Sequence, residues 1–159
     1  MDEAKPVAIE AAAVPEARAA MHYPEPFYSR VRGRVRRALG DFFGLTHFGV
    51  NLTRIPPGGA SALRHTHSRE DELIYILEGE PTLVTNAGET PLRPGMCAGF
   101  KAGSGEAHHL VNKSDRDVVF LEIGDRSLAD TVVYPDVDLG RAISAEGRRI
   151  FVHRDGRPY

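Results

Sequence analysis

Cysteine and tryptophan are almost absent from this chain, which has one cysteine, Cys97, and no tryptophan among 159 residues. A single cysteine excludes an internal disulfide, so a reducing compartment fits best. Because Cys97 lies in the apolar run MCAGF, we expect a buried structural thiol. No apolar run has the length of a membrane-spanning helix, and the charged N-terminus holds no signal-peptide core. These absences predict a cytoplasmic protein without a membrane partner.

An excess of charge is also missing. Lys and Arg total 20 against 22 Asp and Glu, a formal charge of −2. This balance gives no overall attraction to nucleic acid or to an anionic membrane, so we expect a small-molecule ligand or substrate and no nucleic-acid partner.

Short strand-like runs recur from Gly44 onward, among them LTHFGVNLTRI, ELIYILEG, EPTLVTN and VVFLEIG. Turn signals such as PPGG separate these runs, and the rhythm predicts an all-β barrel or sandwich. We expect three segments: an N-terminal arm over residues 1–28, the barrel over residues 29–124, and a C-terminal extension packed on the barrel over residues 125–159.

Arginine alternates with small or apolar residues between Phe27 and Leu39, at Arg30, Arg32, Arg34 and Arg36. A period of two predicts a strand with one basic face. We expect a solvated edge strand, because charges on an edge discourage aggregation. An anion or nucleic-acid site is the alternative, and the role of residues 30–37 is left open.

Four side chains point to a metal site: His65, His67, Glu72 and His108. Residues two apart on a strand share a face, so His65 and His67 can direct two imidazoles at one point. Glu70 and Asp71 compete with Glu72 for the carboxylate position.

Strand parity with Ile74 and Ile76, and the spacing to Gly79, both favour Glu72. His109 competes with His108, but His109 would face the other side of the strand.

Imidazole nitrogens and a carboxylate oxygen suit one divalent transition metal ion such as Zn, Mn, Fe, Ni, Co or Cu, whereas magnesium and calcium prefer more oxygen ligands. Four protein ligands leave one or two positions open on a five- or six-coordinate ion. That arrangement is typical of a working site rather than a closed structural one.

The spacing Gly59-x5-His65-x-His67-x4-Glu72-x6-Gly79 resembles the first motif of the cupin family at every fixed position. The second cupin motif is recognisable but altered. Lys101-Ala102-Gly103 stands where the family usually has Pro-x-Gly, and four residues rather than two separate Gly103 from His108. His108-x3-Asn112 then follows as the family pattern has it. The two motifs cover about a third of the chain, and phrases such as YPEPF and RPGMCAGF look like those of small single-domain bacterial cupins.

The resemblance implies a jelly-roll barrel, or double-stranded β-helix, with the metal inside its mouth and a pocket for one small ligand. Cupins with this site look like sugar-phosphate isomerases or epimerases. We favour such a Lewis-acid enzyme, acting on a small polar substrate that is sugar-phosphate-like or a hydroxy or keto acid. An iron-dependent dioxygenase and a non-catalytic small-molecule-binding or sensor protein are the alternatives. The sequence identifies no general base and no organic cofactor, and shows neither a phosphate-binding glycine loop nor a basic pocket as a motif.

A homodimer is the expected assembly. The arm from Val7 to Ala20 and the aromatic residues Tyr23, Phe27 and Tyr28 lie outside the barrel motifs and need a surface to cover them. Cupins commonly pair two barrels through such segments around a two-fold axis. The alternative is that the arm folds back onto its own barrel.

Overall fold

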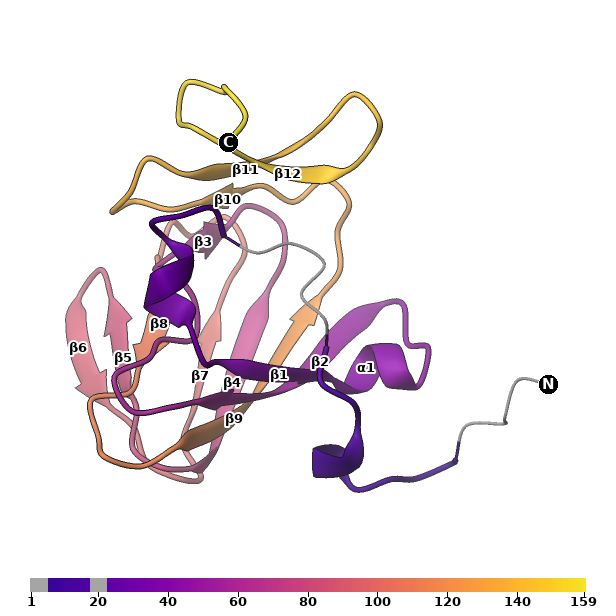
Figure 1. Ribbon diagram of the computed structural model, residues 1–159, viewed down its shortest axis with the longest axis vertical. Coiled ribbons are helices and arrows are strands. Elements are labelled where there is room, and N and C mark those ends of the chain that lie inside the picture. The colour runs from indigo at the N-terminus through magenta and orange to yellow at the C-terminus, as the bar shows by residue number, and fades with distance from the viewer. Residues whose placement is uncertain (1–5, 18–22) are drawn as a thin grey trace.

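The computed structural model describes residues 6–17 and 23–159, and there the chain is mostly strand and turn (Figure 1). Short helical turns are η1 (Ala11–Ala13), η2 (Tyr28–Val31) and α1 (Leu39–Phe42). The strands are β1 (Val35–Ala38), β2 (Phe48–Ile55), β3 (Thr66–His67), β4 (Glu72–Glu78), β5 (Thr82–Thr85), β6 (Gly88–Pro91), β7 (Cys97–Phe100), β8 (His109–Val111), β9 (Val118–Asp125), β10 (Val132–Val133), β11 (Gly140–Ile143) and β12 (Arg149–Val152). The predicted all-β fold is confirmed. None of the helices in these two ranges is long and apolar enough to cross a membrane.

Two antiparallel sheets form the jelly-roll barrel. A five-stranded sheet has the order β1-β2-β9-β4-β7, and a three-stranded sheet has the order β6-β5-β8. Strands far apart in sequence are neighbours, as where β9 lies between β2 and β4, and such crossovers are typical of a jelly roll. A four-stranded sheet, β12-β11-β10-β3, lies across one end of the barrel in Figure 1.

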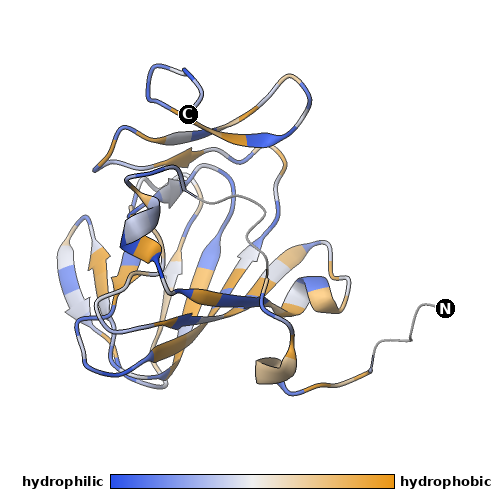
Figure 2. Cartoon of the chain, in the orientation of Figure 1, coloured by the Kyte–Doolittle hydropathy of each residue, from blue (hydrophilic) through white to orange (hydrophobic). Residues whose placement is uncertain are grey.

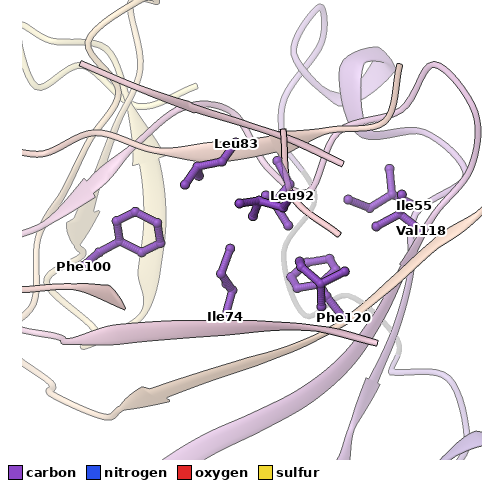
Figure 3. Packing of buried hydrophobic residues seen from close by; sticks show 9 residues of the cluster. Ile55, Ile74, Leu83, Leu92, Phe100, Val118 and Phe120 are labelled. Carbon is purple, nitrogen blue, oxygen red and sulfur yellow. The ribbon is translucent and has the colours of Figure 1, made fainter. Parts of the chain in front are cut away.

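The barrel core follows from strict alternation along the strands. On β4, Ile74 and Ile76 are buried, whereas Leu73, Tyr75 and Leu77 face outward with about two fifths of their surface exposed. Figure 3 shows most of the cluster that fills the interior, which comprises Ile55, Ile74, Ile76, Leu83, Leu92, Phe100, Leu110, Val118 and Phe120. Hydropathy follows the same division, since apolar residues gather in the barrel strands and the loops at the barrel's ends are largely hydrophilic (Figure 2).

Gly79 shows why the first motif needs its last glycine. Its φ of 77° is left-handed, and a Cβ there would lie 2.6 Å from the Asp117 carbonyl oxygen. Only glycine fits this turn between β4 and β5.

A second apolar cluster joins the N-terminal aromatic residues to the end sheet, and it comprises Phe27, Leu63, Val132, Tyr134 and Leu139, with Tyr23, Val137 and Phe151 packed against it. The Tyr23 ring lies 5.8 Å from the Tyr134 ring and 5.2 Å from the Phe151 ring. The C-terminal strands of the same chain therefore supply the surface that Tyr23 and Phe27 were expected to need.

The arm from Val7 to Ala20 lies partly outside the described residues. Within the described part, Val14 is buried and the Ala17 N–H donates to the Arg36 carbonyl at 2.8 Å. Residues 14–17 thus lie against their own barrel, while the homodimer itself stays a prediction.

The arginine run departs from its predicted form. Gly33, with a φ of 81°, separates η2 from β1, so the chain turns before the strand begins. Arg32 points to solvent with 71% of its side chain exposed, whereas Arg34 and Arg36 turn toward the interior and are partly buried. The prediction of one solvated basic face was wrong for Arg34, because the glycine turn breaks the period of two.

Cys97 is another correction. The thiol is exposed, because Cys97 has the outward parity of Tyr75, its partner across β4 and β7. The neighbouring Ala98 packs against the core instead.

Candidate metal centre

His65 and His108 lie directly opposite each other on adjacent segments. Each backbone N–H donates to the other residue's carbonyl, at 3.1 and 2.9 Å, and the two imidazole rings are 5.0 Å apart. The His108 ring also stacks on Phe100, with the ring centroids 3.4 Å apart. This backbone pairing brings the two cupin motifs together.

His67 reaches the same place from β3, which pairs with β10 in the end sheet. Its ring is 5.0 Å from the His65 ring. On its far side, Nδ1 lies 2.7 Å from Asp130 Oδ2. The end sheet therefore holds one of the three imidazoles in position.

Glu72, the first residue of β4, completes the cluster. Its Oε2 lies 3.9 Å from His65 Nε2 and 3.7 Å from His67 Nε2, and its Oε1 lies 3.4 Å from His108 Nε2. The ligand atoms of His65, His67 and Glu72 all lie within 4.8 Å of one another. The four residues selected from sequence thus meet around one carboxylate.

The donor atoms fit a metal ion by two tests. First, two ligand atoms held about 2.0–2.2 Å from one ion are about 3.0–3.4 Å apart at angles of about 90–110°, and the separations of 3.4–3.9 Å from Glu72 lie at or slightly above that range. Second, the buried His108 Nε2 has no hydrogen-bond partner in the described part of the chain. A buried orphan nitrogen of this kind needs a ligand to satisfy it.

The ring nitrogen of His65 that faces away from Glu72 fixes the tautomer of this imidazole. His65 Nδ1 lies 2.8 Å from the Leu63 carbonyl oxygen, which can only accept a hydrogen bond. Nδ1 therefore carries the proton and Nε2 keeps its lone pair. Burial lowers the pKa of His65 to about 4, so the imidazole is neutral at physiological pH.

The other acidic candidates lie beside the cluster rather than at its centre. Glu70 Oε2 is 3.7 Å from Nδ1 of His67, on the far side of that ring from Glu72. Asp71 instead accepts the Ala102 N–H at 2.7 Å and so anchors the altered loop of the second motif. His109 uses Nδ1 on the Ala62 carbonyl, at 2.9 Å.

Two carboxylates that matter were missed from sequence. Asp130 lies in a segment expected to be polar wrapping, and nothing in its spacing relates it to His67. Burial tends to raise the pKa of Asp130, but hydrogen bonds from His67 and the Arg69 N–H outweigh it, so the pKa is lowered. Asp130 is therefore a charged acceptor that orients the His67 ring.

Glu122 could have been found. It continues the core-facing parity of Val118 and Phe120 on β9, where a charged side chain is unusual. Its carboxylate accepts from Asn51 Nδ2 at 3.1 Å and pairs with Arg36 Nη2 at 3.1 Å.

A cavity of about 1300 Å³ opens over this cluster. Its wall includes the four candidate ligands together with Arg34, Arg36, Asn51, Glu122, Tyr134 and Arg141. No arginine cluster at a pocket was evident from the sequence, and the structure brings Arg34 and Arg141, which are 107 positions apart in the chain, to the wall of one cavity.

The chain is similar in sequence and in structure to known proteins. A crystal structure of a sugar phosphate isomerase of the cupin superfamily from Silicibacter pomeroyi is 38% identical, with a TM-score of 0.87, and the match covers 96% of each chain. This chain belongs to the cupin superfamily. The family model of the cupin domain matches residues 51–124.

Two further relatives agree with the assignment as a cupin. A structure of a candidate sugar phosphate isomerase from Acidithiobacillus ferrooxidans is 33% identical, with a TM-score of 0.70, over 79% of this chain and 80% of that chain. An oxalate-binding protein from Thermotoga maritima is 35% identical over 71 residues, which are 44% of this cupin. The match spans 55% of the length of that curated relative.

Proposed function

We propose that this cupin binds one divalent transition metal ion through His65, His67, Glu72 and His108, and that it acts as an isomerase or epimerase on a small polar substrate. The observation that carries the proposal is the convergence of three Nε2 atoms on the Glu72 carboxylate, with a buried, unpartnered nitrogen on His108. The relative from S. pomeroyi, named as a sugar phosphate isomerase, supports the reaction class. We also keep as a proposal the division into an arm (1–28), a barrel (29–124) and a packed extension (125–159).

When bound, the ion would supply Lewis-acid chemistry, lowering the pKa of a hydroxyl group that contacts it. The protein's part is to move a proton between neighbouring carbons of the substrate. Glu122 is well placed to act as the base, because Ile74 pairs with Glu122 and Glu72 pairs with Gly124, so that the two glutamates lie diagonally on one sheet face. Such positions are about 7–8 Å apart along the sheet, which places Glu122 beside the metal-ligand cluster on the cavity wall.

Arg36 and Asn51 hold the Glu122 carboxylate from the other side. A base held in one orientation can take a proton from one carbon and return it to the next. Tyr134 also lines the site, its ring 6.0 Å from the His65 ring. Burial raises the pKa of Tyr134, so its hydroxyl stays protonated, and it forms hydrogen bonds with Tyr23 and Arg141.

A binding protein without turnover is the second candidate, favoured by the match to the oxalate-binding protein from T. maritima. One experiment separates the candidates: metal analysis of native protein, then a screen of aldose and ketose phosphates in D2O by NMR with oxygen uptake recorded. Zinc or manganese with C–H exchange supports the isomerase. Iron with oxygen consumption contradicts it in favour of a dioxygenase, and oxalate binding without any turnover contradicts it in favour of a binding role.

A further inference from the structure

Three arginines gather on the part of the cavity wall around Tyr134, although arginines and carboxylates are equal in number over the whole wall. Arg36 is paired with Glu122, its Nη2 lying 3.1 Å from Oε1. Arg34 and Arg141 also line the cavity, and in the described part of the chain neither forms an ion pair with a carboxylate. Two guanidinium groups in this part of the wall therefore have no carboxylate partner.

Arg34 is held in place by a neutral partner. Its Nη1 donates to the carbonyl oxygen of Ser61, four residues before His65. Burial is the main cause that lowers the pKa of the Arg34 guanidinium, since the nearby Glu122 compensates only part of the lost hydration. A desolvated guanidinium without a carboxylate partner is costly to keep, and an anionic ligand would relieve that cost.

Arg141 meets the same place from the end sheet. It lies on β11, and its guanidinium hydrogen-bonds the buried Tyr134 hydroxyl, which also forms a hydrogen bond with Tyr23. Tyr134 is also a charge neighbour of Arg34. The Tyr134 ring is 6.0 Å from the His65 ring, so this group of donors lies within one small molecule's length of the candidate metal ligands.

We propose that Arg34 and Arg141, with the Tyr134 hydroxyl, bind the phosphate group of a small phosphorylated substrate whose oxygen-bearing end reaches the His65–Glu72 cluster. The inference rests on the proposed function for the metal end of the substrate, and it assigns the anionic end. A phosphate ester carries close to two negative charges at neutral pH, which matches two guanidinium groups that have no carboxylate partner, whereas a single carboxylate would balance only one of them. Each guanidinium can also present two parallel N–H donors to phosphate oxygens.

The test is calorimetric titration of inorganic phosphate into metal-loaded protein. Arg34→Gln and Arg141→Gln should each weaken phosphate binding by about tenfold or more, as expected for the loss of charge-assisted hydrogen bonds. Arg32→Gln removes the same charge from the same segment, but Arg32 is exposed and does not line the cavity. This control should bind phosphate as the wild type does, and all three variants should keep the wild-type metal content.

Two further measurements identify where the anion sits. Chelator-treated wild-type protein should still bind phosphate, whereas loss of binding on chelation, with both arginine variants normal, would place the anion on the metal and overturn the proposal. Oxalate is titrated in parallel: if the arginine variants lose oxalate but not phosphate, the subsite is a carboxylate site and the proposal is wrong.

Folding and metal loading are checked separately. Thermal melting shows whether Arg34→Gln is folded, and if it is not, Arg34→Lys and Arg141→Gln decide the question. Wild-type protein that takes up no metal but binds phosphate through both arginines would refute the proposed function and leave the anion subsite standing. Normal metal content together with equal phosphate affinity in all variants would refute the anion subsite and leave the proposed metal site standing.

Discussion

The side chain of Asp130 should control metal affinity although it touches no metal. Its Oδ2 lies 2.7 Å from His67 Nδ1, and it also accepts the Arg69 backbone N–H at 2.9 Å. The carboxylate fixes the ring orientation and makes the far nitrogen of His67 a better ligand. Removing such an outer partner typically costs 10- to 100-fold in metal affinity, which is about 1.4–2.7 kcal/mol.

The structure narrows that range for two substitutions. Asp130→Asn keeps a carbonyl oxygen able to accept from Nδ1, and Glu70 Oε2 remains 3.7 Å away, so we expect a loss of about tenfold. Asp130→Ala removes the acceptor altogether and should lie near about 100-fold. Affinity is measured by competition with a chromophoric chelator for zinc at fixed pH.

Asp136→Asn is the matched control. Asp136 is six residues along the same segment, but it pairs with Arg64 at 2.7 Å and touches no candidate ligand. Its substitution should leave zinc affinity within about twofold, as expected for a side chain outside the ligand network. Equal affinities in Asp130→Ala and the wild type would refute the reasoning, because His67 would then need no support from the end sheet.

Three other results are expected. Chelator-treated protein should lose stability as pH falls from about 6.5 toward 4, because the unfolded chain binds a proton at His65 in this range and the folded chain does not. Urea unfolding should show a loss of roughly 3 kcal/mol in the free energy of unfolding. A midpoint that does not change with pH, or the same loss in His65→Asn, would contradict this expectation. Glu122→Gln should lower turnover by about 100-fold or more with metal content unchanged, and undiminished turnover would remove Glu122 as the base. We expect the homodimer interface on the outer face of β4 around Tyr75, where apolar side chains are exposed. Light scattering should give twice the 17.4 kDa chain mass for the wild type and for Val133→Glu, and one chain mass for Tyr75→Glu. A monomeric wild type would refute the homodimer.

Local pattern accounts for the parts of this molecule that sequence could predict. The alternation along ELIYILEG gives β4 and its buried Ile74 and Ile76, and the fixed spacings of the cupin motifs place Glu72 at the start of that strand. Gly79 was identifiable because it closes the run ELIYILEG at the fixed spacing from Glu72. These features depend on residues within a few positions of one another.

Long-range contacts explain what was missed. Asp130 lies 63 positions from His67, and Tyr134 and Arg141 reach the site only because β10 and β11 join β3 in one sheet. These contacts follow no local pattern, since they arise when the C-terminal strands close over the barrel. The arginine run is different, because its period of two indicated a strand and a left-handed turn at Gly33 overrode that period and sent Arg34 inward.

His65, His67, Glu72 and His108 are proposed to hold one metal ion together. Equilibrium dialysis against zinc or manganese tests this proposal most directly, in wild-type protein and in His67→Ala, Glu72→Gln and Asp71→Asn. Asp71 is the matched acidic control, because it neighbours Glu72 in sequence and serves the Ala102 N–H instead. We expect one ion per chain in the wild type and in Asp71→Asn, and an affinity at least about 10- to 100-fold weaker in the other two. Equal metal content in all four proteins, or none in the wild type, would contradict the account.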